Sequence, residues 1–192
     1  IWYSIFPNGL FLESEFCFLQ CSTTFLHANT AYITLKNKLL LLNNMAKEIL
    51  IATHNQHKKE EIQQILGGDF KVTSLTDYDI HDEIVEDGHT FHENALIKAK
   101  YCFERTGKPS LGDDSGLVVE SLDGRPGIYS ARYAGNHDFA KNMAKVLEEM
   151  KDEENRKAYF VTVMCLVDES GEHYFEGRVY GNLIHEIRGE KG

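Results

Sequence analysis

Positive charge is scarce in this sequence, which has 20 Lys and Arg residues against 30 Asp and Glu residues and a formal net charge of −10. Nucleic acid held on a basic face needs the opposite balance, so we expect no nucleic-acid partner. Long apolar runs are also missing. The longest in the first 44 residues, Leu39–Leu42, is far too short to cross a bilayer, so we expect no membrane partner. An anionic small substrate would need local cations or a metal ion to offset the negative charge.

Cysteine is rare as well, with Cys17, Cys21, Cys102 and Cys165 as the four examples. The spacing of Cys17 and Cys21 would suit a metal loop only with a second pair of ligands nearby, and the sequence shows none. Cys102 and Cys165 fall at apolar positions of periodic segments, which predicts buried thiols. No disulfide framework is implied, which is typical of a reducing, cytoplasmic location.

The first 44 residues also lack net charge, so the whole −10 falls on residues 45–192. They have neither the basic start and cleavage site of a secretory signal nor a clean helical or strand period. We therefore interpret Met45 as the native start and residues 1–44 as an N-terminal extension, either translated upstream sequence or a cloning remnant. An uncharacterised native extension is the alternative.

From Met45 onward, strand and helix patterns alternate. "KEILIAT" reads as a buried strand and "FKVTSL" as a second strand. Between them, "HNQHKKEEIQQIL" reads as a loop that leads into a helix, which stops at Gly67. The clearest helix spans residues 90–106, with Thr90 and Glu93 spaced as a capping box. Residues 76–89 between these parts are acidic and irregular.

The second half of the sequence predicts strands and one more helix. "PSLGDD" and "GLVVESL" read as two short strands, and residues 138–150 as an amphipathic helix. A hairpin follows and turns near Ser170. The order of elements predicts an α/β fold with a mixed, elongated central sheet flanked by helices.

A phosphate site is one interpretation of Thr53, Asn55 and Lys58, which lie where the first strand turns into a helix. Backbone N–H groups are exposed at such a turn and the helix dipole favours anions. The glycine spacing of a P-loop is absent. Taken alone, a capped helix with a solvated Lys58 is the simpler interpretation.

Two further groups precede the next strand. Glu86 and Asp87 end the acidic loop, and they could complement the helix dipole or bind a hard cation such as Mg²⁺. Asn94 and Lys98 lie one helical turn apart and so share a helix face. Nothing local decides whether Lys98 points to solvent or into a cleft.

The strongest local signal is the pair Asp113 and Asp114, placed at the end of a short apolar run. Neighbouring side chains of an extended segment point to opposite sides, so one carboxylate could bind a metal while the other polarises water. A bound cation would relieve the repulsion between them. An acidic turn completed by Ser115 and Gly116 is the alternative.

As an ordered set, these residues resemble the inosine triphosphate pyrophosphatase family, also called Ham1-like or dITP/XTP pyrophosphatases. The resemblance lies in "ILIATHNQHKKEEI", "VEDGHTFHENALIKAK", "LGDDSGLVVESLDGRPGIYSARYAG" and "GRVYGNLIHEIRGEKG". It runs almost continuously from Lys47 to Gly192. It implies a homodimer that uses Mg²⁺ to hydrolyse ITP, dITP or XTP to the monophosphate and pyrophosphate.

The resemblance also implies a role for each candidate residue. Thr53, Asn55 and Lys58 match the triphosphate loop, Lys98 a second lysine facing the phosphates, and Ser115 a substrate contact. Glu86 matches a magnesium ligand. Asp114 matches a general base that also touches the metal, with Asp113 in support.

The sequence departs from the family at its end, because Gly192 comes before the segments that recognise the purine base in the family. We therefore expect the chain to carry the phosphate and metal half of the site, as an ITPase-like domain over residues 45–192 without its C-terminal part. A non-catalytic fragment that binds magnesium polyphosphate weakly is one alternative. A Maf-like nucleotide pyrophosphatase is the other, although the "GRPGIYSARYAG" block argues against it.

Overall fold

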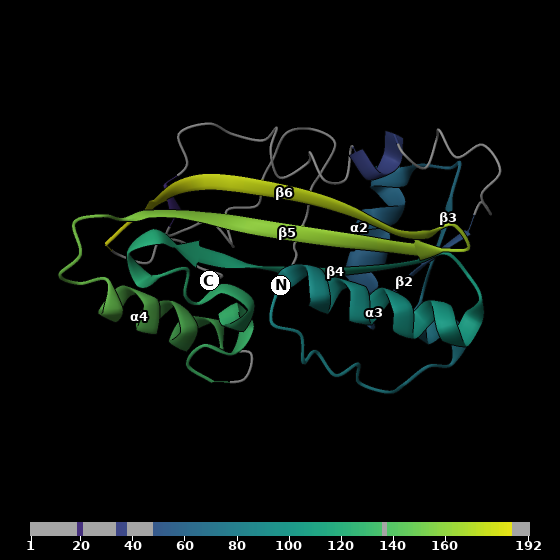
Figure 1. Ribbon diagram of the computed structural model, residues 1–192, viewed down its shortest axis with the longest axis horizontal. Helices are drawn as coiled ribbons and strands as arrows, with labels where there is room; N and C mark the ends of the chain where they lie inside the picture. Colours follow the sequence, from purple (N-terminus) through teal and green to yellow (C-terminus); the bar gives the residue numbers. More distant parts are fainter. Residues whose placement is uncertain (1–18, 21–33, 38–47, 136–137, 186–192) are drawn as a thin grey trace. The chain divides into compact units, whose positions relative to one another are not determined.

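The computed structural model describes residues 19–20, 34–37, 48–135 and 138–185, and Figure 1 shows the arrangement of their helices and strands. The fold is α/β, as the sequence predicts. The strands are β1 (Leu19–Gln20), β2 (Glu48–Ile51), β3 (Lys71–Ser74), β4 (Ser110–Val119), β5 (Lys157–Asp168) and β6 (Gly171–Leu183). The helices are α2 (Gln56–Leu66), α3 (Phe91–Thr106) and α4 (Phe139–Glu149), with short 3₁₀ helices at Leu75–Tyr78 (η1), Glu120–Leu122 (η2) and Gly127–Arg132 (η3).

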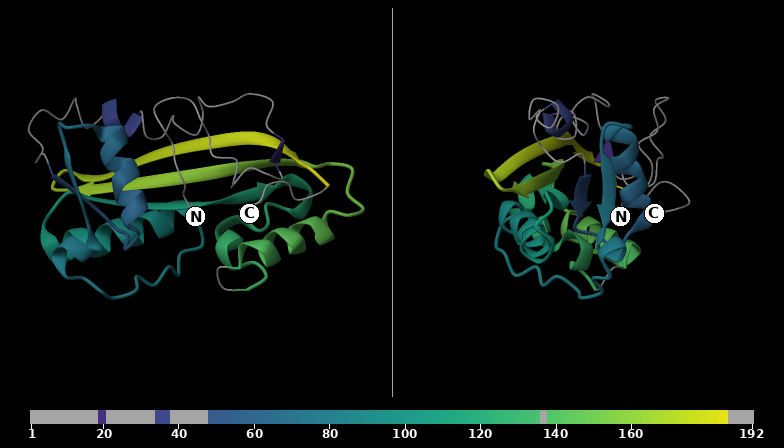
Figure 2. Two further views of the ribbon diagram at one scale, coloured as in Figure 1. Left: turned by 180° about the vertical axis from the view of Figure 1, so that it is seen from behind. Right: turned by 90° about the vertical axis from the view of Figure 1, so that its right-hand side faces the viewer.

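The sheet is mixed, with the strand order β1-β6-β5-β4-β2-β3. Strand β2 pairs in parallel with β3 on one side and with β4 on the other, whereas β1 pairs antiparallel with β6. The chain therefore leaves β2 for β3 through α2, and returns across β2 to β4 through α3. Right-handed crossovers in opposite directions place α2 and α3 on opposite faces of the sheet, as Figures 1 and 2 show.

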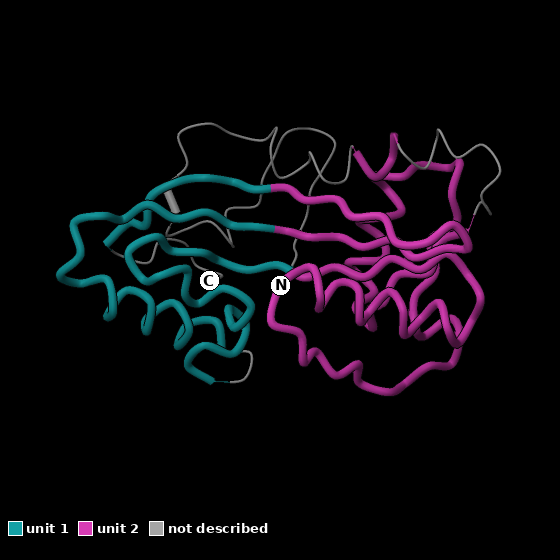
Figure 3. The backbone as a smooth tube through the Cα atoms, viewed as in Figure 1, with its two compact units in different colours: residues 1–28, 115–161, 178–192 teal, residues 29–114, 162–177 magenta. Residues whose placement is uncertain are grey.

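The chain divides into two compact units, which Figure 3 colours separately. Unit 1 comprises residues 1–28, 115–161 and 178–192, and unit 2 comprises residues 29–114 and 162–177. The core of unit 1 is formed by Leu117, Val119, Leu122, Met143, Val146, Met150, Ala158 and Leu183. In unit 2 one core cluster joins Leu50, Leu75 and Cys102, with Tyr78 and Tyr101 packed against it.

Buried thiols are confirmed at both described cysteines. Cys102 and Cys165 are each 0% exposed. Burial raises the pKa of Cys102 to about 12 and the pKa of Cys165 to about 11. Neither thiol is therefore a reactive nucleophile at neutral pH. Cys17 and Cys21 lie outside the described residues.

The two strands predicted at residues 109–122 are one strand, so that part of the sequence interpretation is wrong. Strand β4 runs without a break from Ser110 to Val119, through Ser115 and Gly116. Gly116 has no positive φ and is buried, so it continues the extended backbone instead of turning it. A glycine marks a turn only where the backbone adopts a conformation, such as a positive φ, that other residues avoid.

A short part of the N-terminal segment belongs to unit 2. Residues 34–37 form a helical turn in which Leu35 is fully buried. The ammonium group of Lys36 donates to the Ile65 carbonyl in the last turn of α2, at 2.9 Å. Met45 lies outside the described residues, so the native start there stays a prediction.

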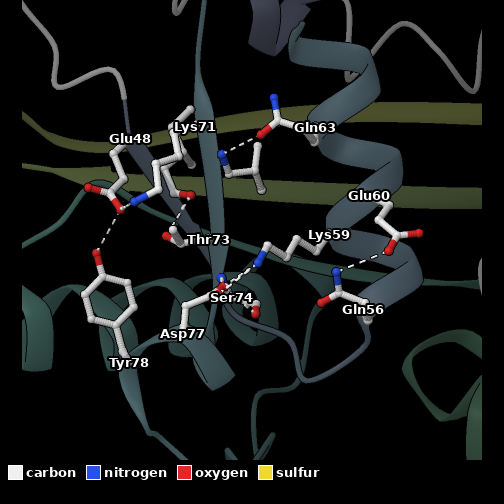
Figure 4. Close-up of polar contacts among 12 residues, drawn as sticks. Glu48, Gln56, Lys59, Glu60, Gln63, Lys71, Thr73, Ser74, Asp77 and Tyr78 are labelled. Carbon is white, nitrogen blue, oxygen red and sulfur yellow. Dashed lines mark hydrogen bonds and ion pairs between the residues drawn. The ribbon is translucent and has the colours of Figure 1, made fainter. Parts of the chain in front are cut away.

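Side chains tie α2 to β3, as Figure 4 shows. The Gln63 amide donates to the carbonyls of Gly67 (2.9 Å) and Phe70 (2.8 Å), and its oxygen accepts from the Val72 N–H (2.9 Å). At the other end of the helix, Lys59 pairs with Asp77 at 2.7 Å. These contacts fix the position of the helix start.

No helix in the described part of the chain is long and apolar enough to cross a membrane.

Candidate active site

The candidate residues gather where β2 and β4 part, on the carboxyl side of these parallel strands. The two strands pair at Leu50 with Ser110 and at Ile51 with Leu111, and the Ala52 N–H then donates to the Leu111 carbonyl at 2.8 Å. The two crossovers run in opposite directions, from β2 to β3 and then from β3 back across β2 to β4, so this point is a topological switch point. Open α/β sheets bind ligands at such points.

The loop after β2 is organised by its own side chains. Thr53 Oγ1 accepts the Asn55 N–H at 3.1 Å, and Asn55 Oδ1 accepts the N–H groups of His57 (2.9 Å) and Lys58 (3.4 Å). Asn55 is thus the N-cap of α2, a contact typically worth about 1 kcal/mol. The first turn of α2 carries no acidic residue, so no side chain of its own offsets the positive end of the helix dipole.

Lys58 is not a solvated charge, so the simpler sequence interpretation of it is wrong. Its side chain is 14% exposed and forms an ion pair with Asp113 of β4, whose side chain is 12% exposed. Lys58 lies in the first turn of α2, where side chains lean towards the start of the helix and so towards the strand. Burial alone would raise the pKa of Asp113. The positive charges of Lys58 and Lys98 outweigh burial and hold the pKa below its ordinary value.

Lys98 of α3 also points inwards and pairs with Glu86 at 3.0 Å. Its side chain is 12% exposed. Glu86 does not cap α3, because Thr90 and Glu93 form the capping box that the sequence predicts. Asp87 is exposed. Of the two acidic residues in this turn, Glu86 is therefore the one that faces the candidate site.

Asp114 contacts α3, whereas Asp113 is paired with Lys58 of α2. Asp114 Oδ2 accepts the Asn94 amide N–H at 2.9 Å. The two neighbouring carboxylates thus have different partners, a lysine of α2 for Asp113 and an amide of α3 for Asp114. Ser115 follows Asp114 in β4, is partly buried, and is the first residue of this part of unit 1.

Gly112 allows α3 to approach β4 this closely. A Cβ atom at Gly112 would lie 2.3 Å from the Ala95 carbonyl oxygen and 2.6 Å from the Ala99 nitrogen. Both are helix backbone atoms that no rotamer change can move. Gly112 and Asn94 contact the elements that carry the candidate residues, and the site prediction did not include them, although the sequence placed Asn94 on the same helix face as Lys98.

The donor set suits a hard cation only in part. Among the described residues, no three His, Cys, Asp or Glu side chains gather as a complete metal site. Mg²⁺ does not need such a set, because it commonly uses one or two carboxylates together with substrate phosphates and water. Glu86 and Asp114 are carboxylates of that kind, and both lie in unit 2 beside residues suited to phosphate.

The sequence profile of the Ham1 family matches residues 49–192, which include every candidate residue. The chain belongs to the Ham1 family.

Relatives in the Ham1 family include proteins named dITP/XTP pyrophosphatase. One from Porphyromonas gingivalis is 41% identical over 148 residues, covering 76% of this chain and 76% of the relative. Another from Halalkalibacterium halodurans is 46% identical over 151 residues, covering 76% of this chain and 78% of the relative. The Ham1 protein of Staphylococcus aureus is similar in structure, with a TM-score of 0.71, 35% identity, and coverage of 76% of each chain.

The Ham1 fold brings two largely covered lysines and three carboxylates to the same end of β2 and β4. Each lysine is paired with a carboxylate, Lys58 with Asp113 and Lys98 with Glu86. A polyanion is a competing partner for both lysines, and a cation is a competing partner for the carboxylates. The arrangement is therefore suited to bind a metal–polyphosphate as one unit.

Proposed function

We propose that this chain hydrolyses non-standard purine nucleoside triphosphates, namely dITP, ITP and XTP, to the monophosphate and pyrophosphate. The single observation that carries the proposal is the grouping of Lys58, Lys98 and Asp114 at the switch point beside the start of α2. Relatives over 40% identical that are named dITP/XTP pyrophosphatase support the choice of substrate class.

In this proposal, different residues bind the phosphates, activate the attacking water and maintain the loop. Lys58, Lys98 and the N–H groups at the start of α2 bind phosphate oxygens, because cations and helix N-termini favour anions. Asp114 accepts a proton from the attacking water and orients it towards the α-phosphorus. Thr53 and Asn55 hold the loop in shape, and Ser115 contacts the substrate.

Mg²⁺ is the proposed cofactor, with Glu86 and Asp114 as its protein ligands and Asp113 in support. When bound, it would neutralise phosphate charge and polarise the bond to be broken. The carboxylates face lysines and an amide in this structure, so bound Mg²⁺ would replace these partners while the lysines turn to phosphate. A cytoplasmic location and a homodimer are proposals that rest on family membership.

The test is pyrophosphate release by the purified chain with Mg²⁺ and each of dITP, ITP, XTP, ATP and GTP. Asp114→Asn removes one charge with almost no change in volume. It should lower kcat by about 10²–10⁴-fold, the contribution of a positioned base, and leave Tm within a few degrees. Activity of Asp114→Asn within a few-fold of wild type would exclude Asp114 as the base.

A further inference from the structure

Asn94 is a buried amide whose side chain the helix does not need. It lies in the first part of α3 and is 1% exposed. Thr90 and Glu93 already satisfy the start of the helix through their capping box. The neighbouring buried positions of α3 are Ala95, Ala99 and Cys102, which are apolar. A polar side chain at this depth therefore requires another explanation.

The amide makes two hydrogen bonds in different directions. Its Nδ2 donates to Asp114 Oδ2 in β4 at 2.9 Å, and its Oδ1 accepts the N–H of Gly88 at 2.9 Å. Gly88 lies two residues after Glu86, at the end of the acidic turn. One side chain thus connects the segment that carries Glu86 with the strand that carries Asp114.

Gly88 gives independent support for this connection. A Cβ atom at Gly88 would lie 2.6 Å from Asn94 Oδ1 and 3.0 Å from the Asn94 nitrogen. The turn approaches the amide so closely that only glycine fits without a shift of backbone or side chain. The contact is therefore built by two positions, an amide on the helix and a residue without a side chain on the turn.

We propose that Asn94 is a positioning residue for the hydrolysis proposed above. It fixes the Asp114 carboxylate in one orientation, with Oδ2 engaged, and holds the turn of Glu86 at a set place relative to that carboxylate. This role rests on the proposed function, because Asn94 acts on the reaction only through Asp114 and Glu86. An amide is the suitable group since it offers a donor to the carboxylate and an acceptor to the N–H at once.

The sharpest variant is Asn94→Asp, which keeps the shape of the side chain. One carboxylate oxygen can still accept the Gly88 N–H, so the contact with the turn survives. The other oxygen faces Asp114 with no proton to donate and a second negative charge. We expect kcat to fall about 10²-fold, the loss typical of a misplaced catalytic group, with KM within about threefold of wild type.

The double variant Asn94→Asp/Asp114→Asn separates positioning from general damage. It exchanges the two groups, so the amide now donates from the strand to a carboxylate on the helix. We expect it to recover more than half of the Tm that Asn94→Asp loses, because the hydrogen bond is restored. Its activity should be as low as that of Asp114→Asn alone, because the carboxylate no longer lies on the strand.

Asn142→Asp is the matched control. Asn142 is also a buried amide, in α4 of unit 1, whose Oδ1 accepts the Ala134 N–H at 2.6 Å and whose Nδ2 donates to the Ala131 carbonyl at 3.0 Å. Its partners are backbone groups without a carboxylate. This variant should lower Tm and leave kcat within about twofold of wild type.

Each result decides a different point. An active wild type with kcat of Asn94→Asp within about threefold of it would overturn the positioning role alone. A double variant no more stable than Asn94→Asp would overturn the assigned hydrogen bond. A folded wild type that releases no pyrophosphate from any of the five triphosphates would overturn the proposed function, and the positioning role with it.

Discussion

Replacing Gly112 with alanine tests whether the close approach of α3 to β4 builds the site. The added Cβ would lie 2.3 Å from the Ala95 carbonyl oxygen, whereas ordinary contact begins at 3.4 Å. Helix and strand must therefore separate by about 1.1 Å. The nearest atoms belong to the helix backbone, so the whole first half of α3 has to move.

Two effects of different size follow from that displacement. Overpacking in a well-packed core costs about 1–3 kcal/mol. At roughly 2–4 °C per kcal/mol for a protein of this size, Tm should fall by about 2–12 °C. Lys98 and Asn94 move with the helix, and a misplacement of about 1 Å costs roughly 10²-fold in rate. We therefore expect kcat/KM for dITP to fall by about 10²-fold.

The assay combines thermal unfolding with pyrophosphate release under saturating Mg²⁺. Gly68→Ala is the control, because a Cβ at Gly68 meets nothing within 4 Å. It should leave both measurements unchanged. If Gly112→Ala kept the wild-type Tm and a kcat/KM within twofold of wild type, the close packing would not be needed and the reasoning would be refuted.

Two more predictions concern lysine–aspartate pairs. Lys58→Ala should raise KM for dITP at least about tenfold and lower Tm, because it removes a phosphate partner and breaks the ion pair of Asp113. The control is Lys59→Ala, which breaks the ion pair with Asp77 and should lower Tm without changing KM. If both variants changed KM equally, Lys58 would have no special role in binding phosphate. Hydrogen bonds from Lys59 and from Ser74 lower the pKa of Asp77 from 3.8 to about 2. Asp77 therefore stabilises the fold above pH 3.8 and loses this effect as pH falls towards 2, so the Tm deficit of Asp77→Asn should be present at pH 7 and shrink across that window. A deficit independent of pH would show that charge is not involved.

Local signals predicted the elements well. The N-cap and the glycine stop of α2, the capping box of α3 and the hairpin of β5 and β6 are each set by residues close in sequence. The candidate residues of the loop after β2 and the aspartate pair were found in the same way, since each has its own pattern.

The partners of these residues could not be predicted, because they depend on how distant elements pack. Nothing near Lys58 in the sequence shows that its ammonium group is buried against Asp113, 55 residues further on. The sequence shows a glycine at position 112, but a glycine in a strand can mark a bend, a bulge or a close helix contact. The sequence does not tell which of these applies. The role proposed for Asn94 depends on its contacts with Gly88 and Asp114, which come from separate segments and cannot be predicted from the sequence.

The switch point also has a consequence for how the protein folds. Its residues come from three stretches, 53–58, 86–98 and 113–114, which meet only after both crossovers around β2 are complete. Contacts of such sequence separation form late and slowly. A ligand that contacts all three stretches binds only the folded state of unit 2. Its binding therefore stabilises that unit, by about 2.7 kcal/mol when the ligand concentration is a hundred times Kd. Bound nucleotide would thereby stabilise the contacts that form last in folding. The amide hydrogens of β2 and α3 should exchange more slowly when it is bound.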